Sequence, residues 1–254
     1  MHIFEFSENN ALEMIGGIID ATDYVDENTY ANDEFTQFMK EALVNGPNGF
    51  FPSFDGGGAL EWEIGSFDIT AMAMNIGENE VGRNYNYFAG QIAYKLNTSW
   101  GEGNYRLIVD TTREDFKDED GKDDERRLAA LLSFDQQLGD IFSAFIPVGW
   151  QDDDPAIDYN ALYSGGVNIT GKWYGHKQAN IVFGYAYLNG ENDFDYSQVA
   201  EIYWRAVFND YFAATADFQY MKDEFDTDDD EIEGIIGSIR LTAEFQVGKT
   251  FAAV

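Results

Sequence analysis

The sequence predicts an all-β protein, an antiparallel up-and-down transmembrane β-barrel. Apolar and polar residues alternate in many segments of about ten residues, the length that a tilted strand needs to cross a bilayer. The connections between these segments are alternately short and long, as in a meander with two different ends. Aromatic residues gather near the segment ends. We therefore expect one barrel domain over residues 1–254, with a long helix-containing loop at 21–58.

The chain begins with two candidate strands and then leaves the alternating pattern. Residues 1–6 alternate weakly, and residues 12–20 alternate around a Gly pair. Residues 21–58 do not alternate, and within them 32–42 has the apolar spacing of a short helix. We predict that the apolar stripe of this helix packs against the inner wall and that its charged side chains face the water path, so that the segment narrows a pore. The alternative is an outer lid that caps the mouth of the pore without entering it. The stripe is Phe35, Phe38 and Met39, and the charged residues are Asp33, Glu34 and Lys40.

The remaining candidate strands follow at regular spacing. The alternation predicts eleven of them, which with 12–20 makes twelve full strands and one partial strand at 1–6. They are residues 59–65, 66–75, 86–96, 104–111, 127–136, 139–148, 161–170, 179–188, 197–208 with 211–221 as a tight hairpin, and 235–245.

The connections predict which end of the barrel is which. The long ones, at 21–58, 77–85, 112–126, 149–160, 189–196 and 222–233, hold most of the 47 Asp and Glu residues. Long loops of outer-membrane barrels lie outside the cell and short turns lie in the periplasm. We expect a periplasmic aromatic band of Trp100, Trp173, Phe208, Tyr211 and Phe212. The outer band would hold Tyr85, Tyr87, Trp150, Tyr159 and Tyr163.

Charged residues on the polar strand faces are the candidate pore lining. A lipid-facing Arg or Lys near the membrane centre costs about 2–4 kcal/mol, so these faces should line water. The residues are Lys95, Arg106, Asp110, Asp135, Glu201, Tyr203, Arg205, Asp217, Arg240 and Glu244. The opposing interpretation is the solvated outer face of a soluble sandwich. The acidic outer loops should attract cations, whereas basic and acidic side chains nearly balance in this set. Together these observations predict a weak cation preference that fades with salt.

Composition excludes several classes of function. A net charge of −32 argues against nucleic-acid binding, which needs clusters of Lys and Arg. Cys is absent, so disulfides and thiolate chemistry are excluded. His2 and His176 form no metal or triad spacing, and pairs such as Glu61 and Glu63 are expected by chance in so acidic a chain. We predict no enzyme activity.

The acidic loops raise the question of a metal site. Asp152–Asp154 and Asp228–Asp230 cluster oxygen ligands, but neither has the spacing of a calcium-binding loop. We therefore expect no cofactor and no specific metal site. A solvated acidic surface, with divalent cations loosely bound between the loops and anionic lipid headgroups, is the favoured interpretation.

Six stretches, in order along the chain, resemble the carbohydrate-selective (OprB-like) porins of Gram-negative outer membranes. They are residues 16–39, 103–111, 131–150, 167–175, 198–221 and 234–245. The resemblance implies a 16-stranded barrel in the cell outer membrane that passes mono- and oligosaccharides by facilitated diffusion, although some relatives pass inorganic ions. It also implies contact with outer-membrane lipid and lipopolysaccharide, and a homotrimer is the assembly common among porins. Residues 23–39 fall where the family carries an inward loop.

The sequence differs from that family pattern in two respects. Thirteen strands fall short of sixteen, and the amino terminus shows neither the basic nor the apolar region of a signal peptide, so we expect an N-terminally truncated chain. The chain also runs on past Phe245 through 246–254, where such barrels end on an aromatic residue and where Phe251 is the candidate. The alternative from another class is a soluble or surface-attached β-protein that binds glycans without transport.

Overall fold

Thirteen antiparallel strands form one sheet in which every strand pairs with its neighbours in the sequence, in the order β1 to β13. The computed structural model describes residues 2–7, 9–79, 82–225 and 231–243. The predicted Glu244 and Phe251 and the Asp228–Asp230 cluster lie outside the described residues. The predicted all-β, up-and-down fold and its thirteen strands are confirmed. The strands are β1 His2–Ser7, β2 Asn10–Ile19, β3 Asp55–Ile64, β4 Phe67–Ile76, β5 Tyr85–Thr98, β6 Gly101–Lys117, β7 Asp124–Leu138, β8 Phe142–Gln151, β9 Tyr159–Thr170, β10 Ala179–Gly190, β11 Phe194–Asn209, β12 Phe212–Phe225 and β13 Glu231–Ala243.

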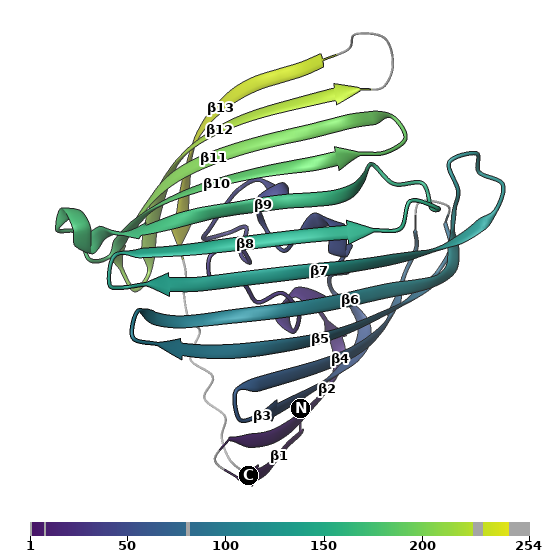
Figure 1. The fold of residues 1–254 in the computed structure, drawn as a ribbon, viewed down its shortest axis with the longest axis horizontal. Helices are drawn as coiled ribbons and strands as arrows, with labels where there is room; N and C mark the ends of the chain where they lie inside the picture. The colour runs from purple at the N-terminus through teal and green to yellow at the C-terminus, as the bar shows by residue number, and fades with distance from the viewer. Residues whose placement is uncertain (1, 8, 80–81, 226–230, 244–254) are drawn as a thin grey trace.

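The sheet is curved and carries one long segment on its inner side. In Figure 1 the strands lie side by side in chain order, and the purple chain that joins β2 to β3 passes behind the middle strands. This segment, residues 20–54, contains three of the four short 3₁₀ helices. The helices are η1 Ala21–Asp23, η2 Glu41–Leu43, η3 Pro47–Gly49 and η4 Gly171–Tyr174. In the described part of the chain no helix is long and apolar enough to cross a membrane.

The helix predicted over 32–42 does not form. The range contains one turn, in which the Gln37 N–H donates to the Asp33 carbonyl at 2.9 Å. The Asp33 carboxylate accepts the Phe35 N–H at 2.7 Å and so closes that turn locally. The next N–H groups, of Met39 and Lys40, donate to a carboxylate on β11 instead of to carbonyls four residues earlier. A helix cannot continue when its donors are taken by a partner outside it.

The two faces of the sheet differ in polarity, as the alternation predicts. On β5, Tyr87, Ala89, Gln91 and Ala93 are buried, whereas every second residue between them is exposed. We call the face covered by segment 20–54 the inner face and the opposite one the outer face. The same two-residue period runs through β4 and β6 to β12, so one face of the sheet is buried and polar in part, and the other is exposed.

Some strand ends and turns differ from the expectation. Strands β6 and β7 run past the predicted 104–111 and 127–136, so that the connection between them is 118–123 rather than 112–126. An ion pair of 2.6 Å between Lys117 and Asp124 joins the extended strand ends. The Gly pair in β2 does not break the strand, because Gly16 and Gly17 face Gly58 and Gly57 on β3, where a Cβ on Gly57 would lie 2.6 Å from Met74.

The predicted aromatic band is present at the end with the short turns. At the opposite end, only some of the predicted aromatic residues are exposed. Trp100, Trp173, Phe208, Tyr211 and Phe212 are all exposed at the end with the short turns. At the opposite end Trp150 and Tyr163 are exposed, whereas Tyr85 and Tyr159 are half-buried. The placement of Tyr87 in the outer band is wrong. Its position in the alternation directs it to the inner face, where it is fully buried against the ring of Phe50.

Candidate functional site

The inner face and segment 20–54 form the candidate functional site. The predicted inward residues that the structure describes all lie at inner-face positions, and Arg106, Asp110, Asp135, Glu201, Tyr203 and Asp217 are buried there. Arg205 and Arg240 are half-buried, and Lys95 is exposed. The structure gathers most of them into two groups that hold two neighbouring stretches of the segment, one group on β5 to β7 and one on β11 to β13.

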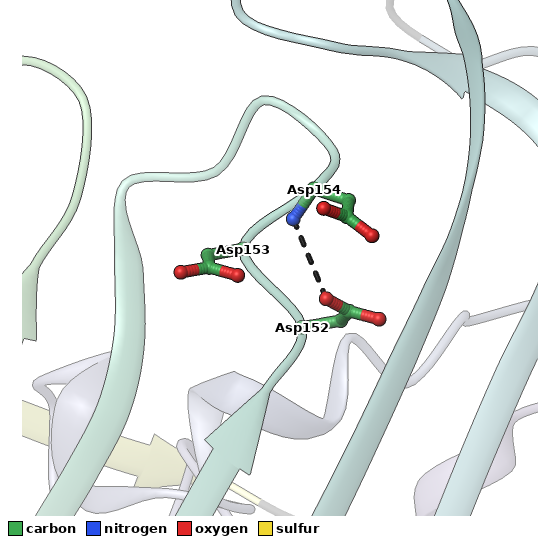
Figure 2. Close-up of side chains that lie close together, drawn as sticks. All are labelled: Asp152, Asp153 and Asp154. Carbon is green, nitrogen blue, oxygen red and sulfur yellow. Dashed lines mark hydrogen bonds between the residues drawn. The ribbon is translucent and has the colours of Figure 1, made fainter.

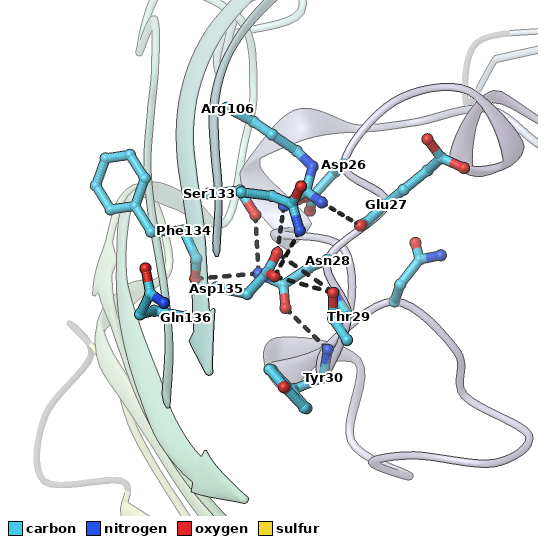
Figure 3. Close-up of polar contacts among 12 residues, drawn as sticks. Asp26, Glu27, Asn28, Thr29, Tyr30, Arg106, Ser133, Phe134, Asp135 and Gln136 are labelled. Carbon is cyan, nitrogen blue, oxygen red and sulfur yellow. Dashed lines mark hydrogen bonds and ion pairs between the residues drawn. The ribbon is translucent and has the colours of Figure 1, made fainter. Parts of the chain in front are cut away.

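The first group holds residues 26–30 and is centred on an ion pair. Arg106 Nη1 lies 2.5 Å from Asp135 Oδ2, and both side chains are almost completely buried. Arg106 also donates to the Glu27 carbonyl, and the Thr29 hydroxyl donates to Asp135 at 2.9 Å. The Asn28 amide donates to the Ser133 hydroxyl at 3.1 Å. Figure 3 shows these side chains reaching from β6 and β7 to the segment. A buried, fully bonded ion pair of this kind fixes geometry.

Asp26 is the most unusual residue of this first group. It adopts a left-handed backbone conformation, with φ at 53°, and its side chain is buried. Its N–H donates to Gln91 on β5 at 2.9 Å, whereas its carboxyl Oδ1 has no hydrogen-bond partner in the described chain. Burial raises the pKa of Asp26 to about 7, an effect that the nearby Ser133 hydroxyl and Arg106 guanidinium only partly offset. Burial also raises the pKa of the neighbouring Glu27.

The second group, on β11 to β13 of the same inner face, holds residues 34–40. The Glu201 carboxylate accepts the N–H groups of Met39 and Lys40 at 2.7 and 3.0 Å. Arg240 on β13 donates to the carbonyls of Glu34 and Gln37. Four backbone groups of the segment are thus bonded by two side chains of opposite charge. Two neighbouring stretches of segment 20–54 are therefore held by charged inner-face residues from different parts of the sheet.

An apolar cluster lies between the two groups. Phe38 is fully buried, with its ring 5.5 Å from that of Phe145 on β8 and 5.2 Å from that of Tyr203 on β11. Leu43 packs into the same cluster. Phe38 therefore packs on the inner wall, at the position predicted for the stripe. The same contact covers the Tyr203 ring, so this predicted pore-lining residue packs on the segment.

The other two residues of the predicted stripe, Phe35 and Met39, are less buried than Phe38. Phe35 points away from the wall and is 69% exposed, because the helix that would have placed it beside Phe38 does not form. Met39 is half-buried, and its sulfur accepts the Ser238 hydroxyl at 3.3 Å. Asp33 and Lys40 are half-buried, whereas Glu34 is exposed.

Several residues of the site could not be identified from the sequence pattern. Asn28 and Thr29 looked like ordinary loop residues. Arg127, whose guanidinium lies 4.2 Å from the centre of the Phe50 ring, was the first residue of a predicted strand but was not among the predicted pore-lining residues. Gly184 gives space to Phe38, since a Cβ there would lie 2.8 Å from Phe38 Cζ. A glycine at an inner-face position of a long strand is a signal in the sequence for a ring packed above it.

Two pockets remain between the segment and the sheet near the short-turn end. One, of about 450 Å³, is lined mainly by hydrogen-bonding side chains, among them Gln37, Asn168, Asn180 and Arg205. The other, of about 430 Å³, is lined by acidic side chains of β2 to β4 together with Lys95 and Arg106. Both have the size of small-ligand sites. The segment thus leaves polar space rather than sealing the inner face completely.

The acidic connection after β8 lies away from these pockets. The carboxylate oxygens of Asp152, Asp153 and Asp154 come within 4.8 Å of one another, and Asp153 and Asp154 are exposed. Figure 2 shows the Asp154 N–H directed at Asp152 Oδ1, 3.4 Å away. Exposed acidic clusters are common without an ion, so loose divalent-cation binding here stays a prediction.

Comparisons with known proteins point to one fold. No protein-family model matches the chain. The high-pH structure of Pseudomonas putida OprB matches with a TM-score of 0.72 at 12% identity, covering 96% of this chain and 71% of that one. Pseudomonas aeruginosa OccK2 (OpdF), in complex with glucuronate, matches with a TM-score of 0.47 at 9% identity, covering 94% of this chain and 79% of that one. An uncharacterised protein of Aquifex aeolicus is 26% identical over 208 residues, 82% of this chain; the chain spans 58% of that relative's length.

Proposed function

We propose that this chain, which has an OprB-like porin fold, forms the wall of an outer-membrane channel for the passive diffusion of small solutes. Segment 20–54 narrows that channel from inside. The observation that carries the proposal is the polarity of the sheet: in the middle of the strands the charged residues are on the inner face, and the outer face is apolar and exposed. No enzymatic step is part of this proposal.

The outer face has the composition of a surface that meets lipid. Its large apolar side chains are well exposed on strand after strand; they include Ile92, Leu107, Val109, Ile146, Val167, Phe183, Ile202, Trp204, Phe218, Ile239 and Leu241. Soluble monomers rarely expose a continuous apolar patch of more than a few hundred Å². A hydrocarbon environment satisfies such a face, while the antiparallel ladders satisfy the backbone. These observations favour a barrel in the outer membrane over a soluble glycan-binding protein.

Carbohydrates are the proposed solutes. The pocket of Gln37, Asn168, Asn180 and Arg205 offers amide and guanidinium groups that hydrogen-bond hydroxyls. The second candidate is a channel for inorganic ions, which the acidic loops favour. With a net charge of −32, the channel should prefer cations weakly at low ionic strength and lose that preference as salt screens the charges. Contacts with lipopolysaccharide and a homotrimeric assembly complete the proposal.

Single-channel recording in planar bilayers tests the function. The detergent-folded protein should insert, conduct and show a current reduced by added mono- or oligosaccharides. Deleting Asn28–Pro47 should raise the conductance and weaken the sugar block together, because it removes the part of the segment that the inner face holds. Deleting 119–122, in an acidic connection away from the inner face, is the control and should change neither. A chain that is monomeric and soluble without detergent would contradict the proposal.

The reversal potential tests the alternative of ion transport. Across a salt gradient, the protein should give a small cation-selective potential at low ionic strength that diminishes as the salt is raised. Firm anion selectivity at low salt would be inconsistent with the acidic loops. Strong cation selectivity without any sugar block would favour the inorganic-ion channel instead.

A further inference from the structure

A basic pocket on the inner face has the features of a binding site for an anion. It is the pocket of about 450 Å³ near the short turns, between segment 20–54 and strands β9 to β11. Of the described residues that line it, Lys177 and Arg205 are basic and none is acidic. In the whole chain 47 acidic residues stand against 15 basic ones, so composition alone would place acids in this lining. A local positive charge in a concave site attracts anions.

Arg205 places the positive charge inside this pocket. It is half-buried on β11, and its Nε is buried and has no hydrogen-bond partner among the described residues. The ion pairs of the described chain include neither Arg205 nor Lys177. By contrast, Arg106 pairs with Asp135, and Arg240 donates to two carbonyls of the segment. A guanidinium has five N–H donors, so an anion in the pocket would supply bonds that the protein does not.

The neighbouring strands show that a hydrogen-bond acceptor is missing beside Arg205. Thr215 on β12 is the register partner of Arg205 and also of Arg240 on β13. Thr215 is 1% exposed, and its hydroxyl has no hydrogen-bond partner in the described chain; the same is true of the buried Nε of Arg240. Three groups on one row of the sheet, with strands about 4.8 Å apart, are thus unbonded. Because guanidinium nitrogens can only donate, what this row lacks is an acceptor.

The predicted inward acids on β11 and β12 are bonded elsewhere. The Asp217 carboxylate accepts the Gln219 amide at 2.7 Å and the Ser238 hydroxyl at 3.3 Å. The Glu201 carboxylate accepts two N–H groups of segment 20–54. Neither acid lines the pocket, so the described lining has a formal charge of +2 from its two basic residues.

The other lining residues indicate what the anion carries. They include the amides of Asn168 and Asn180 and the hydroxyls of Thr36 and Thr170. The Asn180 amide donates to the Asn168 side-chain oxygen at 3.0 Å, so the two amides fix each other's orientation. Amides and hydroxyls suit a body that bears many hydroxyl groups. A bare inorganic anion would leave most of a pocket of this size unfilled.

We propose that this pocket binds a sugar acid. Its carboxylate lies on the Nη groups of Arg205, because Nε is covered, and its hydroxyl groups lie on the amides of Asn168 and Asn180. The two parallel N–H groups of a guanidinium match the two oxygens of a carboxylate. Lys177, exposed at the rim, adds attraction at longer range. The inference rests on the proposed function, in which the inner face passes carbohydrates, and assigns a negative charge to the favoured ones.

Isothermal titration calorimetry on the detergent-folded protein tests this site with three probes. D-gluconate and D-glucitol differ only in the carboxylate at one end of the same hydroxylated chain, and acetate has the carboxylate without the chain. We expect gluconate to bind roughly tenfold more tightly than either, since it alone makes both kinds of contact. Competition with glucitol 6-phosphate, which carries a phosphate on the same chain, distinguishes a carboxylate site from a phosphate site.

Variants of the two basic residues locate the site. Arg205→Gln should weaken gluconate binding roughly tenfold and change glucitol binding little, and Arg205→Lys, which keeps the charge but loses the paired donors, should lie between. A thermal melt checks that these variants fold. Lys177→Gln changes an exposed side chain and should weaken gluconate binding roughly threefold. Its matched control is Lys172→Gln, a basic residue of the same connection outside the lining, which should bind like the unchanged protein.

Four results would overturn the inference. Equal affinity for gluconate and glucitol would mean that the pocket does not recognise the charge. Acetate that binds as tightly as gluconate would identify a site for small anions only. Glucitol 6-phosphate that binds more tightly than gluconate would identify a phosphate site. Unchanged gluconate binding in both Arg205→Lys and Lys177→Gln would place the ligand elsewhere. Calorimetry registers binding whether or not the protein conducts, so this inference and the channel function fail separately.

Discussion

The Glu201 carboxylate on β11 accepts the backbone N–H of Met39 at 2.7 Å, although the two residues are 162 positions apart in the chain. The same carboxylate accepts the N–H of Lys40 at 3.0 Å. One inner-face side chain therefore replaces two bonds that a helix would have made. The position of segment 20–54 thus depends on the chemistry of this residue.

Replacing Glu201 should loosen the segment locally. In Glu201→Gln the charge is lost and one acceptor oxygen becomes a donor, so the charge-assisted bonds to Met39 and Lys40 weaken by about 1–2 kcal/mol. Hydrogen exchange of these two amides should become roughly tenfold faster. Thr215→Val, an inner-face change on β12 at a hydroxyl without a partner, is the control and should leave their exchange unchanged. Equal exchange in both variants would show that Glu201 does not hold the segment.

The two phenylalanines of the predicted stripe should respond in opposite ways. Phe38→Ala removes a fully buried ring from between Phe145 and Tyr203 and should cost about 3–5 kcal/mol of docking free energy. Phe35→Ala changes an exposed ring and should cost little. Limited proteolysis in detergent should cleave segment 20–54 much faster in the first variant only. Similar cleavage of both would mean that the segment is not held by its apolar contacts.

The strands could be predicted from the sequence more completely than the conformation of the segment between β2 and β3. A two-residue period needs only local information, so the alternation on strands such as β5 and β11 predicted both their existence and their inner residues. The same rule, applied to Tyr87, directs it inward, yet its place near a strand end led to a wrong assignment to an aromatic band. Phe35 and Phe38 have helical spacing, but Glu201 takes the N–H groups that the helix needed. That partner lies on β11 and has no local signature.

The attachment of residues 26–30 should weaken as the pH rises. The pKa of Asp26 is raised to about 7 in the folded protein, above the ordinary value near 4, so the folded state favours the protonated carboxyl. Its contribution to stability is complete below pH 4 and is lost as the pH rises to about 7, by at most about 1.4 kcal/mol per pH unit. Proteolysis of segment 20–54 should therefore be faster at pH 8 than at pH 5.

Asp26→Asn isolates the cause of this pH dependence. An amide stays neutral, so the variant should show the slow proteolysis of the low-pH state at both pH values. Thr22→Val, elsewhere in the segment, should keep the pH dependence. If the asparagine variant responds to pH as the unchanged protein does, another titrating group controls the attachment.

A methyl group added at Gly184 should displace the segment. The new Cβ would lie 2.8 Å from Phe38 Cζ and 3.1 Å from Leu43 Cδ2, so Gly184→Ala should cost about 1–3 kcal/mol. Gly90→Ala, whose nearest Cβ neighbour is 3.9 Å away, is the matched control in another strand and should be neutral. Thermal melts of both variants measure the stability of the whole protein, and proteolysis of segment 20–54 is the second measurement. Together they distinguish displacement of the segment from a general loss of stability.

The long-range fastening of segment 20–54 also constrains the order in which the protein assembles. Residues 20–54 leave the ribosome long before their partners Glu201 and Arg240. Contacts between such distant residues form late and slowly, because a long loop must close first. Phe38 and Leu43 therefore remain unburied until β11 is in place, because the cluster that buries them lies on β8 to β11. Throughout that interval the nascent chain exposes an apolar stretch, and we expect a chaperone bound there to reduce its aggregation.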